Sequence, residues 1–334
     1  MKAFTLKEDG KMKKFLILLL AMILMAGCNG AASGEDNATD YPSKPITLLV
    51  AYSAGGGTDT GARILQKYLE EELGVTVNVE NKPGGAGWVA WSDLAYAKPD
   101  GYTIGYINSP NIITGYLDPQ NNRKESLDNF QFIANHVLDP GVVAIKKGET
   151  RFTNFDEMIE YAKNNHLTAT TSGNGSNDHM AILKMNEYYG TNITPVHTKG
   201  AAEGSTQVLG GHVDLFVAKT GEAVKLHENQ QLEAIAVFSE ERSPFLKEVP
   251  TTVELGYEDL IFRSARGLAA PSGLSKEKLE ILNNALKKAM EKAEHIEQMN
   301  KQGLQVHYLS PSEYKEMMKE DEDDVKSVSD LLGY

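Results

Sequence analysis

Apolar and polar positions along the chain predict a series of buried strands joined by amphipathic helices. Residues 46–50 (ITLLV) indicate a buried strand, and residues 51–63 (AYSAGGGTDTGAR) follow it. Residues 65–73 then carry leucine and tyrosine at helical spacing, closed by Gly74. A strand, a glycine-rich turn and a helix in this order aim backbone N–H groups and the positive end of the helix dipole at one place. The stretch indicates an anion site built from backbone, or equally a tight turn that binds nothing.

The spacing within residues 51–63 excludes two familiar phosphate sites. The four glycines do not give the G-x-G-x-x-G pattern of dinucleotide-binding turns. Thr58 and Asp59 stand where a P-loop needs a lysine followed by serine or threonine. Asp59 would repel a phosphate, so we expect it to cap the helix or to order a water molecule that bridges to a ligand.

Similar turns follow two more predicted strands in the first part of the chain. Residues 75–79 alternate as a strand and lead into the glycine-rich residues 81–87 (NKPGGAG), and residues 102–107 lead into Asn108 and Ser109. Strands that alternate with helices over short turns form parallel sheets covered on both faces. Ligands of such sheets bind at the carboxyl ends of the strands, which is where all three turns lie.

A second series of the same kind follows a long extended segment, residues 130–146. It includes a strand at 167–171 with a third glycine turn at 172–178, and a strand at 193–196 that leads to residues 197–200. Residues 262–271 return the chain to the first series. The first series is then completed by a helix on 275–299 with one apolar face and by a final helix capped at Ser310. We therefore predict an α/β protein with two lobes, each a mainly parallel sheet flanked by helices, hinged by two crossing segments.

Composition narrows the class of ligand and the chemistry. The chain has 334 residues and a net charge of −13, which argues against a nucleic-acid partner. The field of the whole protein would also repel an anion, so an anion site must use local dipoles. The eight histidines show no metal-ligand spacing, and no cofactor motif is present, so we expect neither metal nor cofactor. Ser176 and His179 are better explained as a helix cap and a polar contact than as a catalytic pair.

The N-terminal residues predict export and a lipid anchor. Two lysines precede an apolar run at 15–25, which is short for a membrane span and ends in Ala26-Gly27-Cys28. This ending resembles a bacterial lipobox, although Met25 stands where leucine is usual; an ordinary cleaved signal is the alternative. We expect a signal peptide at 1–27 with Met12 as a possible true start, lipidation of Cys28, and a flexible tether through residue 40. The protein would then sit on the extracytoplasmic face of the cell membrane.

Motifs spread over nearly all of the remaining chain resemble one family. The chain is similar to the solute receptors of tripartite tricarboxylate transporters, the Bug-type receptors. In the first half the resemblance rests on residues 41–46 (YPSKPI), 54–56 (AGG) with Asp59, 62–63 (AR), 79–81 (VEN), 83–87 (PGGAG) and 98–103 (KPDGYT). In the second half it rests on 175–176 (GS) with His179, 199–200 (KG), 210–214 (GGHVD), 249–251 (VPT), 254–256 (ELG) and 267–271 (GLAAP).

The resemblance implies a type II periplasmic-binding-protein fold with lobe 1 at 41–142 and 260–334 and lobe 2 at 143–259. It implies a monomeric receptor, not an enzyme, that binds a small carboxylate between the lobes and delivers it to membrane permease subunits. The family holds the carboxylate mainly with backbone N–H groups, small hydroxyls and water. The predicted ligand-binding residues in lobe 1 are Tyr52, Ser53, Ala54, Gly55, Gly56, Thr58, Asp59 and Asn108. Those in lobe 2 are Ser172, Gly173, Asn174, Gly175, Ser176, His179, Thr198, Lys199, Gly200 and Lys219.

Three departures from the family pattern bear on the ligand. Thr198 replaces an aromatic residue before Lys199, Ala265 and Arg266 replace an aromatic pair before Gly267, and Lys219 ends a strand. Arg266 and Lys219 would suit a more anionic ligand if they faced the cleft. We favour the interpretation that both are solvated surface residues. An exported hydrolase that uses the same cleft, and a ligand sensor for a membrane signalling partner, are the alternative functions.

Overall fold

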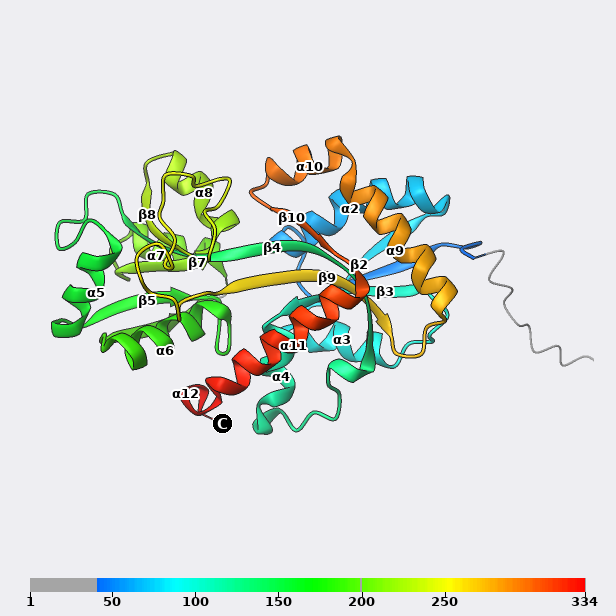
Figure 1. Cartoon of the computed structure of the whole chain (residues 1–334), viewed down its shortest axis with the longest axis horizontal. Helices are drawn as coiled ribbons and strands as arrows, with labels where there is room; N and C mark the ends of the chain where they lie inside the picture. Colours follow the sequence, from blue (N-terminus) through cyan, green and yellow to red (C-terminus); the bar gives the residue numbers. More distant parts are fainter. Residues whose placement is uncertain (1–40, 199, 334) are drawn as a thin grey trace, which may run out of the picture. The chain divides into compact units, whose positions relative to one another are not determined.

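The computed structural model describes residues 41–198 and 200–333, and residues 42–334 belong to one structural unit. Within it one hydrogen-bonded sheet has the strand order β2-β1-β3-β9-β4-β7-β5-β6, and β10 and β8 pair with β4 outside this path. Figure 1 shows the strands in two groups that β4 and β9 connect. The predicted α/β class and the two series of alternating strands and helices are confirmed.

The first group of strands is parallel at its outer edge. β1 (Ile46–Val50) lies between β2 (Val77–Asn81) and β3 (Thr103–Ser109), and both pairings are parallel. β9 (Arg263–Pro271) runs antiparallel beside β3, and β10 (Val306–Leu309) pairs with β4. Every residue of β1 except Thr47 is buried, as expected for a parallel strand that helices cover on both faces.

The second group repeats the arrangement. β5 (Leu167–Thr171) pairs in parallel with β6 (Ile193–His197) and with β7 (Leu215–Lys219). β8 (Leu232–Phe238) runs antiparallel to β4. The carboxyl ends of β5, β6 and β7 therefore lie at one edge of this group, as those of β1, β2 and β3 do in the first.

β4 (Phe130–Lys146) belongs to both groups. Its residues from Phe130 to Pro140 pair with β9, and those from Gly141 to Lys146 pair with β8. Gly141 also opposes Lys219 at the end of β7. The chain thus crosses between the groups in β4 and returns in β9, as the two extended segments of the sequence predicted (Figure 1).

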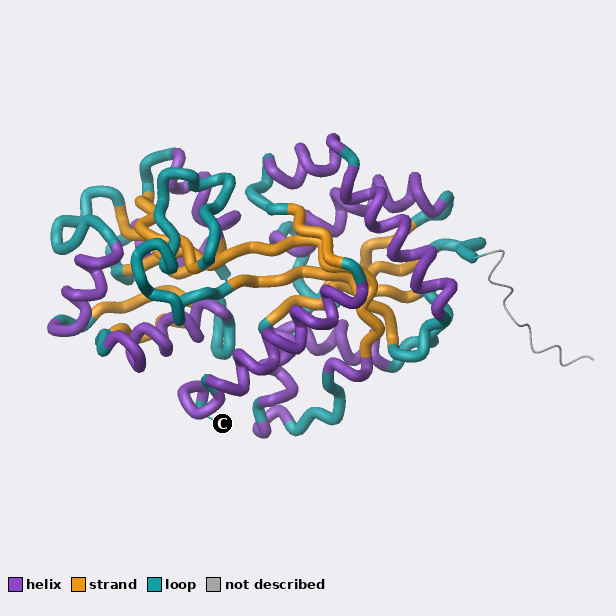
Figure 2. Tube along the Cα trace, viewed as in Figure 1, coloured by secondary structure: helices purple, strands orange, loops and turns teal. Residues whose placement is uncertain are grey.

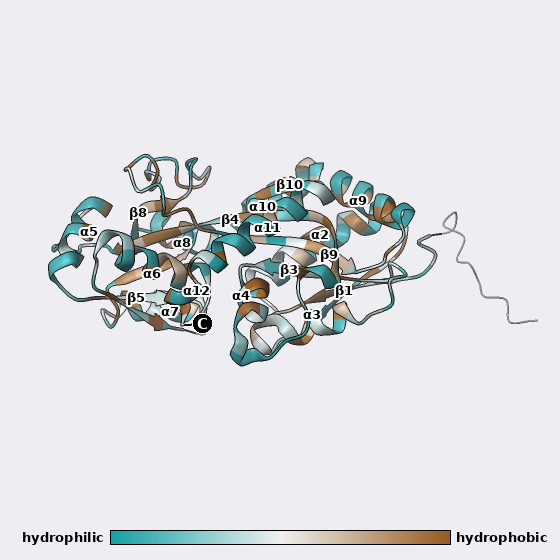
Figure 3. Cartoon of the chain, turned by 60° about the horizontal axis from the view of Figure 1, so that its bottom comes forward, coloured by the Kyte–Doolittle hydropathy of each residue, from teal (hydrophilic) through white to brown (hydrophobic). Residues whose placement is uncertain are grey.

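Helices flank both groups of strands (Figure 2). The first group carries α2 (Gly57–Leu73), α3 (Trp88–Ala95), α4 (Asn111–Leu117), α9 (Lys276–Glu291), α10 (Ala293–Asn300), α11 (Pro311–Ser327) and α12 (Ser329–Leu332). The second carries α5 (Phe155–Asn164), α6 (Asn177–Tyr189), α7 (Ala201–Leu209) and α8 (Thr220–Glu228). Short 3-10 helices lie at Gly85–Gly87, Pro119–Asn121 and Leu127–Asn129. Hydrophobic colour in Figure 3 follows the strands, and the helices carry more of the hydrophilic colour.

Helix starts agree with the capping signals in the sequence. The side chains of Asn154, Ser275 and Ser310 each accept a hydrogen bond from a backbone N–H in the first turn of α5, α9 and α11. Ser310 and Glu313 also form the predicted capping box, with proline at the start of the helix. Local sequence therefore determines where these helices begin.

The prediction of a single helix on 275–299 is wrong, because the helical conformation is interrupted at Lys292. Lys292 has extended backbone angles and separates α9 from α10, which then packs against α2. Leu282, Leu286 and Met290 are buried as expected, but Ile296 is 37% exposed. The change of direction moves Ile296 off the buried face, an effect that helical periodicity alone cannot show.

No helix in the described part of the chain is both long enough and apolar enough to cross a membrane. The predicted signal peptide, Cys28 and the tether lie outside the described residues, as does Lys199.

Candidate functional site

The turn between β1 and α2 presents backbone to solvent. Ser53, Ala54, Gly55 and Gly56 are all exposed, and Gly55 has φ +86°, a value that favours glycine. Gly56 is the N-cap residue of α2, and no side chain caps the helix there. The first N–H groups of α2 have no intrahelical acceptor, so this turn leaves donors at the positive end of a 17-residue helix.

Asp59 supports this turn from inside the protein. It is 3% exposed, and its carboxylate accepts hydrogen bonds from the Gly55 N–H (2.8 Å), Arg63 Nε (3.1 Å) and Asn81 Nδ2 (2.9 Å). Burial raises the pKa of Asp59, but these hydrogen bonds outweigh it and hold the pKa below its ordinary value. Asp59 therefore stays ionised and links the glycine turn to the end of β2.

Asn108 and Thr58 join the end of β3 to the first turn of α2. Asn108 Nδ2 donates to Thr58 Oγ1 at 2.9 Å, and both side chains are buried. Asn108 Oδ1 is also buried but has no hydrogen-bond partner. Tyr52, at the start of the turn, is half-buried and packs edge-on against Trp91, with ring centroids 6.2 Å apart.

Arg266 lies beside this group, and its expected place on the solvated surface is wrong. It is 6% exposed and sits on β9 directly opposite Asn108 of β3. Its Nη2 donates to Asp139 Oδ2 at 3.2 Å, so the charge is buried against a carboxylate of β4. Burial raises the pKa of Asp139 to about 6 even though Arg266 opposes the shift. The sequence signal was an arginine flanked by small and apolar residues near the middle of an extended segment. Its partner, 127 positions away, could not be inferred from that signal.

The glycine turn of the second lobe precedes α6 and is held by its own residues. Ser176 caps α6 by accepting from the His179 N–H at 3.3 Å, as predicted, and its hydroxyl donates to the Gly173 carbonyl at 2.8 Å. Gly173 and Gly175 both have positive φ. Ser172 and Asn174 are exposed on this turn, while Gly175 is buried.

His179 is neutral in this arrangement. The Gly175 N–H donates to His179 Nδ1 at 3.2 Å, so the ring proton lies on Nε2. Burial, with the neighbouring His197 ring, lowers the pKa of His179 to about 4. The two rings meet edge-on with centroids 4.9 Å apart. His179 therefore offers an N–H donor and no positive charge at neutral pH.

Lys219 is buried, so its expected place on the solvated surface is also wrong. Its Nζ donates to Asp178 Oδ2 at 2.8 Å and to Ser172 Oγ at 2.7 Å. Burial lowers the pKa of Lys219, but Asp178 and Glu222 outweigh it and raise the pKa above its ordinary value. Ser172 in turn donates to Asp178 through both its N–H (3.1 Å) and its hydroxyl (2.5 Å). The lysine thus fastens the end of β7 to the glycine turn.

The end of β6 completes the second set of predicted residues. Thr198 Oγ1 donates to the Thr171 carbonyl at 2.9 Å, and Gly200 is the N-cap residue of α7 with φ +145°. The structure thus brings the predicted residues together in two sets, one at the start of α2 and one at the start of α6.

Contacts between the lobes bring the α6 turn to the first lobe. A Cβ on Gly175 would lie 3.0 Å from the Thr114 side chain of α4, the helix that follows β3. The Gly221 N–H of α8 donates to Asp139 Oδ1 at 3.1 Å. Because α4 begins at the carboxyl end of β3, the turn before α6 faces the same edge of the first group of strands as the turn before α2.

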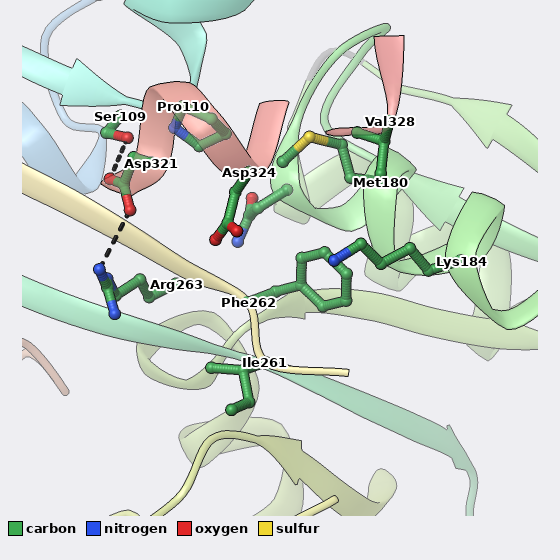
Figure 4. Close-up of a pocket in the computed structure, with 11 residues that line it drawn as sticks. Ser109, Pro110, Met180, Lys184, Ile261, Phe262, Arg263, Asp321, Asp324 and Val328 are labelled. Atoms are coloured by element: carbon green, nitrogen blue, oxygen red, sulfur yellow. Dashed lines mark hydrogen bonds and ion pairs between the residues drawn. The ribbon is translucent and has the colours of Figure 1, made fainter. Parts of the chain in front are cut away.

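A separate pocket lies where α6, β9 and α11 meet (Figure 4). Its volume is about 40 Å³, and Asp321 on its wall accepts hydrogen bonds from Arg263 (3.1 Å) and from the Ser109 hydroxyl. Of the residues predicted to bind the ligand, none lines this pocket. A volume of this size holds a water molecule or two, so the pocket is too small for an organic acid. Among the described residues no cluster of His, Cys, Asp or Glu could hold a metal ion.

Comparison with known proteins identifies the family. Residues 61–333 match the model of the tripartite tricarboxylate transporter family receptor, TctC. A UPF0065 protein from Cupriavidus necator is 28% identical over 305 residues, which cover 91% of this chain and 92% of the relative. This chain belongs to the tripartite tricarboxylate transporter receptor family.

Solved structures have the same fold. A TctC solute-binding protein from Polaromonas, solved without ligand, has a TM-score of 0.76 at 27% identity, covering 87% of this chain and 99% of that one. MatC from Rhodopseudomonas palustris with bound malate has a TM-score of 0.73 at 23% identity and covers 87% of this chain and 100% of its own. An R. palustris protein with adipate has a TM-score of 0.77 at 24% identity, covering 88% and 99%. The family and its solved members are solute-binding receptors rather than enzymes, and the predicted periplasmic-binding-protein fold is confirmed.

Proposed function

We propose that this receptor captures a small di- or tricarboxylate, or a related organic acid, between its lobes and delivers it to a membrane permease of the tripartite tricarboxylate type. The observation that carries the proposal is the exposed glycine turn before α2, whose helix start has no side-chain cap. Backbone N–H groups at such a helix start bind carboxylates well. The α6 turn at the same edge of the first lobe supports a binding site with two sides.

The relatives support a carboxylate as the ligand. Malate and adipate, the ligands of two solved proteins of this fold, are both dicarboxylic acids. We propose the predicted residues of the two turns, including Lys199 in the undescribed part, as the contacts. Neutral His179 would contribute an N–H donor, and Asp59 and Lys219 would hold the turns in shape.

We also propose the lobe boundaries and the anchor. Residues 41–142 with 260–334 form lobe 1 and residues 143–259 form lobe 2, which is supported by the change of β4 partners after Pro140. The lipobox-like residues before Cys28 support a lipid-anchored receptor on the extracytoplasmic face. Cys28→Ser should release the protein from the membrane fraction, and a variant that stays there would rule out this anchor.

The experiment that tests the function is a thermal and calorimetric screen of the purified protein. The panel contains mono-, di- and tricarboxylates, amino acids, aromatic acids and neutral sugars as controls. A ligand at 100 times its Kd should stabilise the fold by about 2.7 kcal/mol, and it should be recovered chemically unchanged. Binding of sugars but of no carboxylate, or conversion of a bound acid to product, would contradict the proposal.

A further inference from the structure

Arg266 has donors that the protein does not use. Its side chain is 7% exposed, and Nη2 is paired with Asp139 at 3.2 Å. Nη1 is shielded from solvent and has no hydrogen-bond partner. A buried charged nitrogen without an acceptor is strongly unfavourable, so an arrangement that leaves one points to an acceptor that arrives with a ligand.

The unused nitrogen faces the start of α2. A Cβ on Gly57, the first residue of the helix, would lie 3.2 Å from Arg266 Nη1 and 3.5 Å from Cζ. The guanidinium therefore stands against the positive end of the helix dipole, where a cation alone is disfavoured. An anion held between the helix start and Arg266 would satisfy both.

Asn108 supplies a third group at the same place. It opposes Arg266 in the antiparallel pairing of β3 with β9, so the two side chains leave the same face of the sheet. One amide atom of Asn108 bonds to Thr58 Oγ1, and the other is buried without a partner. If the amide rotates by half a turn, Thr58 donates to Oδ1 and Nδ2 is free to donate to an anion.

We propose that Arg266, Asn108 and the first turn of α2 form a subsite for a carboxylate, so that the receptor selects acids that carry two carboxylates over acids that carry one. The inference rests on the proposed function and divides its two turns between the two carboxylates: this subsite, at the start of α2, holds one carboxylate, and the turn before α6 holds the other. The planar fork of a guanidinium matches a carboxylate, which a lysine ammonium does not. Lys219 is not part of the subsite, since Asp178 and Ser172 already engage its Nζ.

The test compares acids matched in length. The purified protein is titrated calorimetrically with straight-chain diacids from malonate to adipate and with monoacids of the same carbon number from propanoate to hexanoate. We expect the best diacid to bind at least tenfold more tightly than its matched monoacid. The difference reflects one charge-assisted interaction with Arg266.

Two variants and one control assign this preference to Arg266. Arg266→Gln should weaken diacid binding by 10- to 100-fold and change monoacid binding by less than threefold. A second variant, Arg266→Met with Asp139→Asn, removes both charges of the buried pair, so that loss of binding cannot be ascribed to an unpaired Asp139. Arg263→Gln is the matched control, because Arg263 lies on the same strand but bonds to Asp321 and lines the small pocket of Figure 4. It should leave the ratio of diacid to monoacid affinity unchanged.

The outcomes separate this inference from the proposed function. If no carboxylate of either series binds the unaltered protein, the proposed function itself is contradicted. If carboxylates bind but matched diacids and monoacids bind equally, the second-carboxylate subsite is overturned while the receptor function stands. Variants of Arg266 that remain folded, as shown by calorimetric unfolding, and keep the full diacid preference would overturn it as well.

Discussion

Two glycines that flank α2 both have a positive φ, but only one of them lies at the proposed binding site. Gly55, in the turn before the helix, has φ +86°, and Gly74, which ends it, has φ +69°. At both positions a Cβ would have no other atom within 4 Å. An alanine at either position is therefore penalised by backbone strain alone, at about 1–2 kcal/mol.

Gly55→Ala and Gly74→Ala should therefore destabilise the protein alike but differ in their effect on binding. Each should lower the free energy of unfolding by about 1–2 kcal/mol, measured by chemical denaturation. Only Gly55→Ala should weaken carboxylate binding, by tenfold or more, because it reshapes the turn that carries the N–H donors. Equal affinities of the two variants would show that the turn before α2 does not hold the ligand.

For single residues, structural roles could be predicted from the sequence where the hydrogen-bond partner is close in the chain. The Ser176 cap is an example, since its partner lies three positions away. The expected cap of α2 by Asp59 is wrong, because no side chain caps that helix and Asp59 instead accepts from the Gly55 N–H in the turn before it. Arg266 and Lys219 were misplaced because their counter-charges, Asp139 and Asp178, come from other elements. A charged side chain is usually solvated, and only the fold reveals a buried partner for it.

Among the elements, α11 is fastened to the strands by one buried carboxylate. Asp321 is 8% exposed and bonds to Arg263 on β9 and to the hydroxyl of Ser109 at the end of β3. Figure 4 shows Asp321 between these two groups. The helix has other polar residues nearby, such as Asp323, whose side chain is 81% exposed.

Asp321→Ala should destabilise the protein by about 2–3 kcal/mol, because it leaves the Ser109 hydroxyl without its acceptor and Arg263 with only the longer ion pair to Glu320, at 3.6 Å. Asp323→Ala on the same helix is the control and should change the free energy of unfolding by less than about 0.5 kcal/mol. Urea titration of both variants measures the difference. A loss for Asp321→Ala no larger than that of the control would show that this contact does not fasten α11.

The boundaries of elements were predictable where a cap marks them. Asn154, Ser275 and Ser310 begin their helices as the sequence indicated. The break at Lys292 carries no such mark: neither glycine nor proline stands there, and the apolar spacing continues across it. Packing of α10 against α2 decides it, and that contact joins segments more than 200 residues apart.

For the whole molecule, buried neutral histidines make stability depend on pH. The hydroxyl of Tyr106 lies 2.6 Å from His136 Nδ1, His136 Nε2 lies 3.1 Å from His295 Nε2, and His295 Nδ1 lies 3.3 Å from the Met290 carbonyl. A carbonyl only accepts, so when both rings are neutral every proton in the row points from Tyr106 towards Met290. Burial lowers the pKa of His295 to about 4 and that of His136 well below its ordinary value.

We expect the free energy of unfolding to fall as the pH falls from 7 to 5. A histidine whose pKa is lower in the folded state than in the unfolded state stabilises the fold above pH about 6.5 and loses that contribution as the pH drops towards 4. His136, His179 and His295 each act this way, and for His179 and His295, each with a pKa of about 4, the loss at pH 5 is about 2 kcal/mol. Asp139, with its pKa raised to about 6, and Asp321, whose burial also raises its pKa, oppose part of this loss.

Denaturation at several pH values measures this dependence. His295→Gln is the informative variant, because the amide can accept from His136 and donate to Met290 but cannot take up a proton. It should reduce the loss of stability between pH 7 and pH 5 by about 2 kcal/mol. A stability that is flat over this range in the unaltered protein would contradict the neutral row of side chains.

The position of β9 between β3 and β4 has a consequence for the order of folding. β3 ends at Ser109, and its antiparallel neighbour begins only at Arg263. The strands β5 to β8 and the second half of β4 all precede β9 in the chain. During synthesis, which starts at the N-terminus, the strands of the second lobe are all made before β9, so this lobe is the first that can assemble completely. β1, β2 and β3 cannot form their finished sheet until β9 has been made. The group of strands that starts the sequence is thus the last to be completed. Arg266 reaches its position beside Asn108 only when β9 pairs with β3.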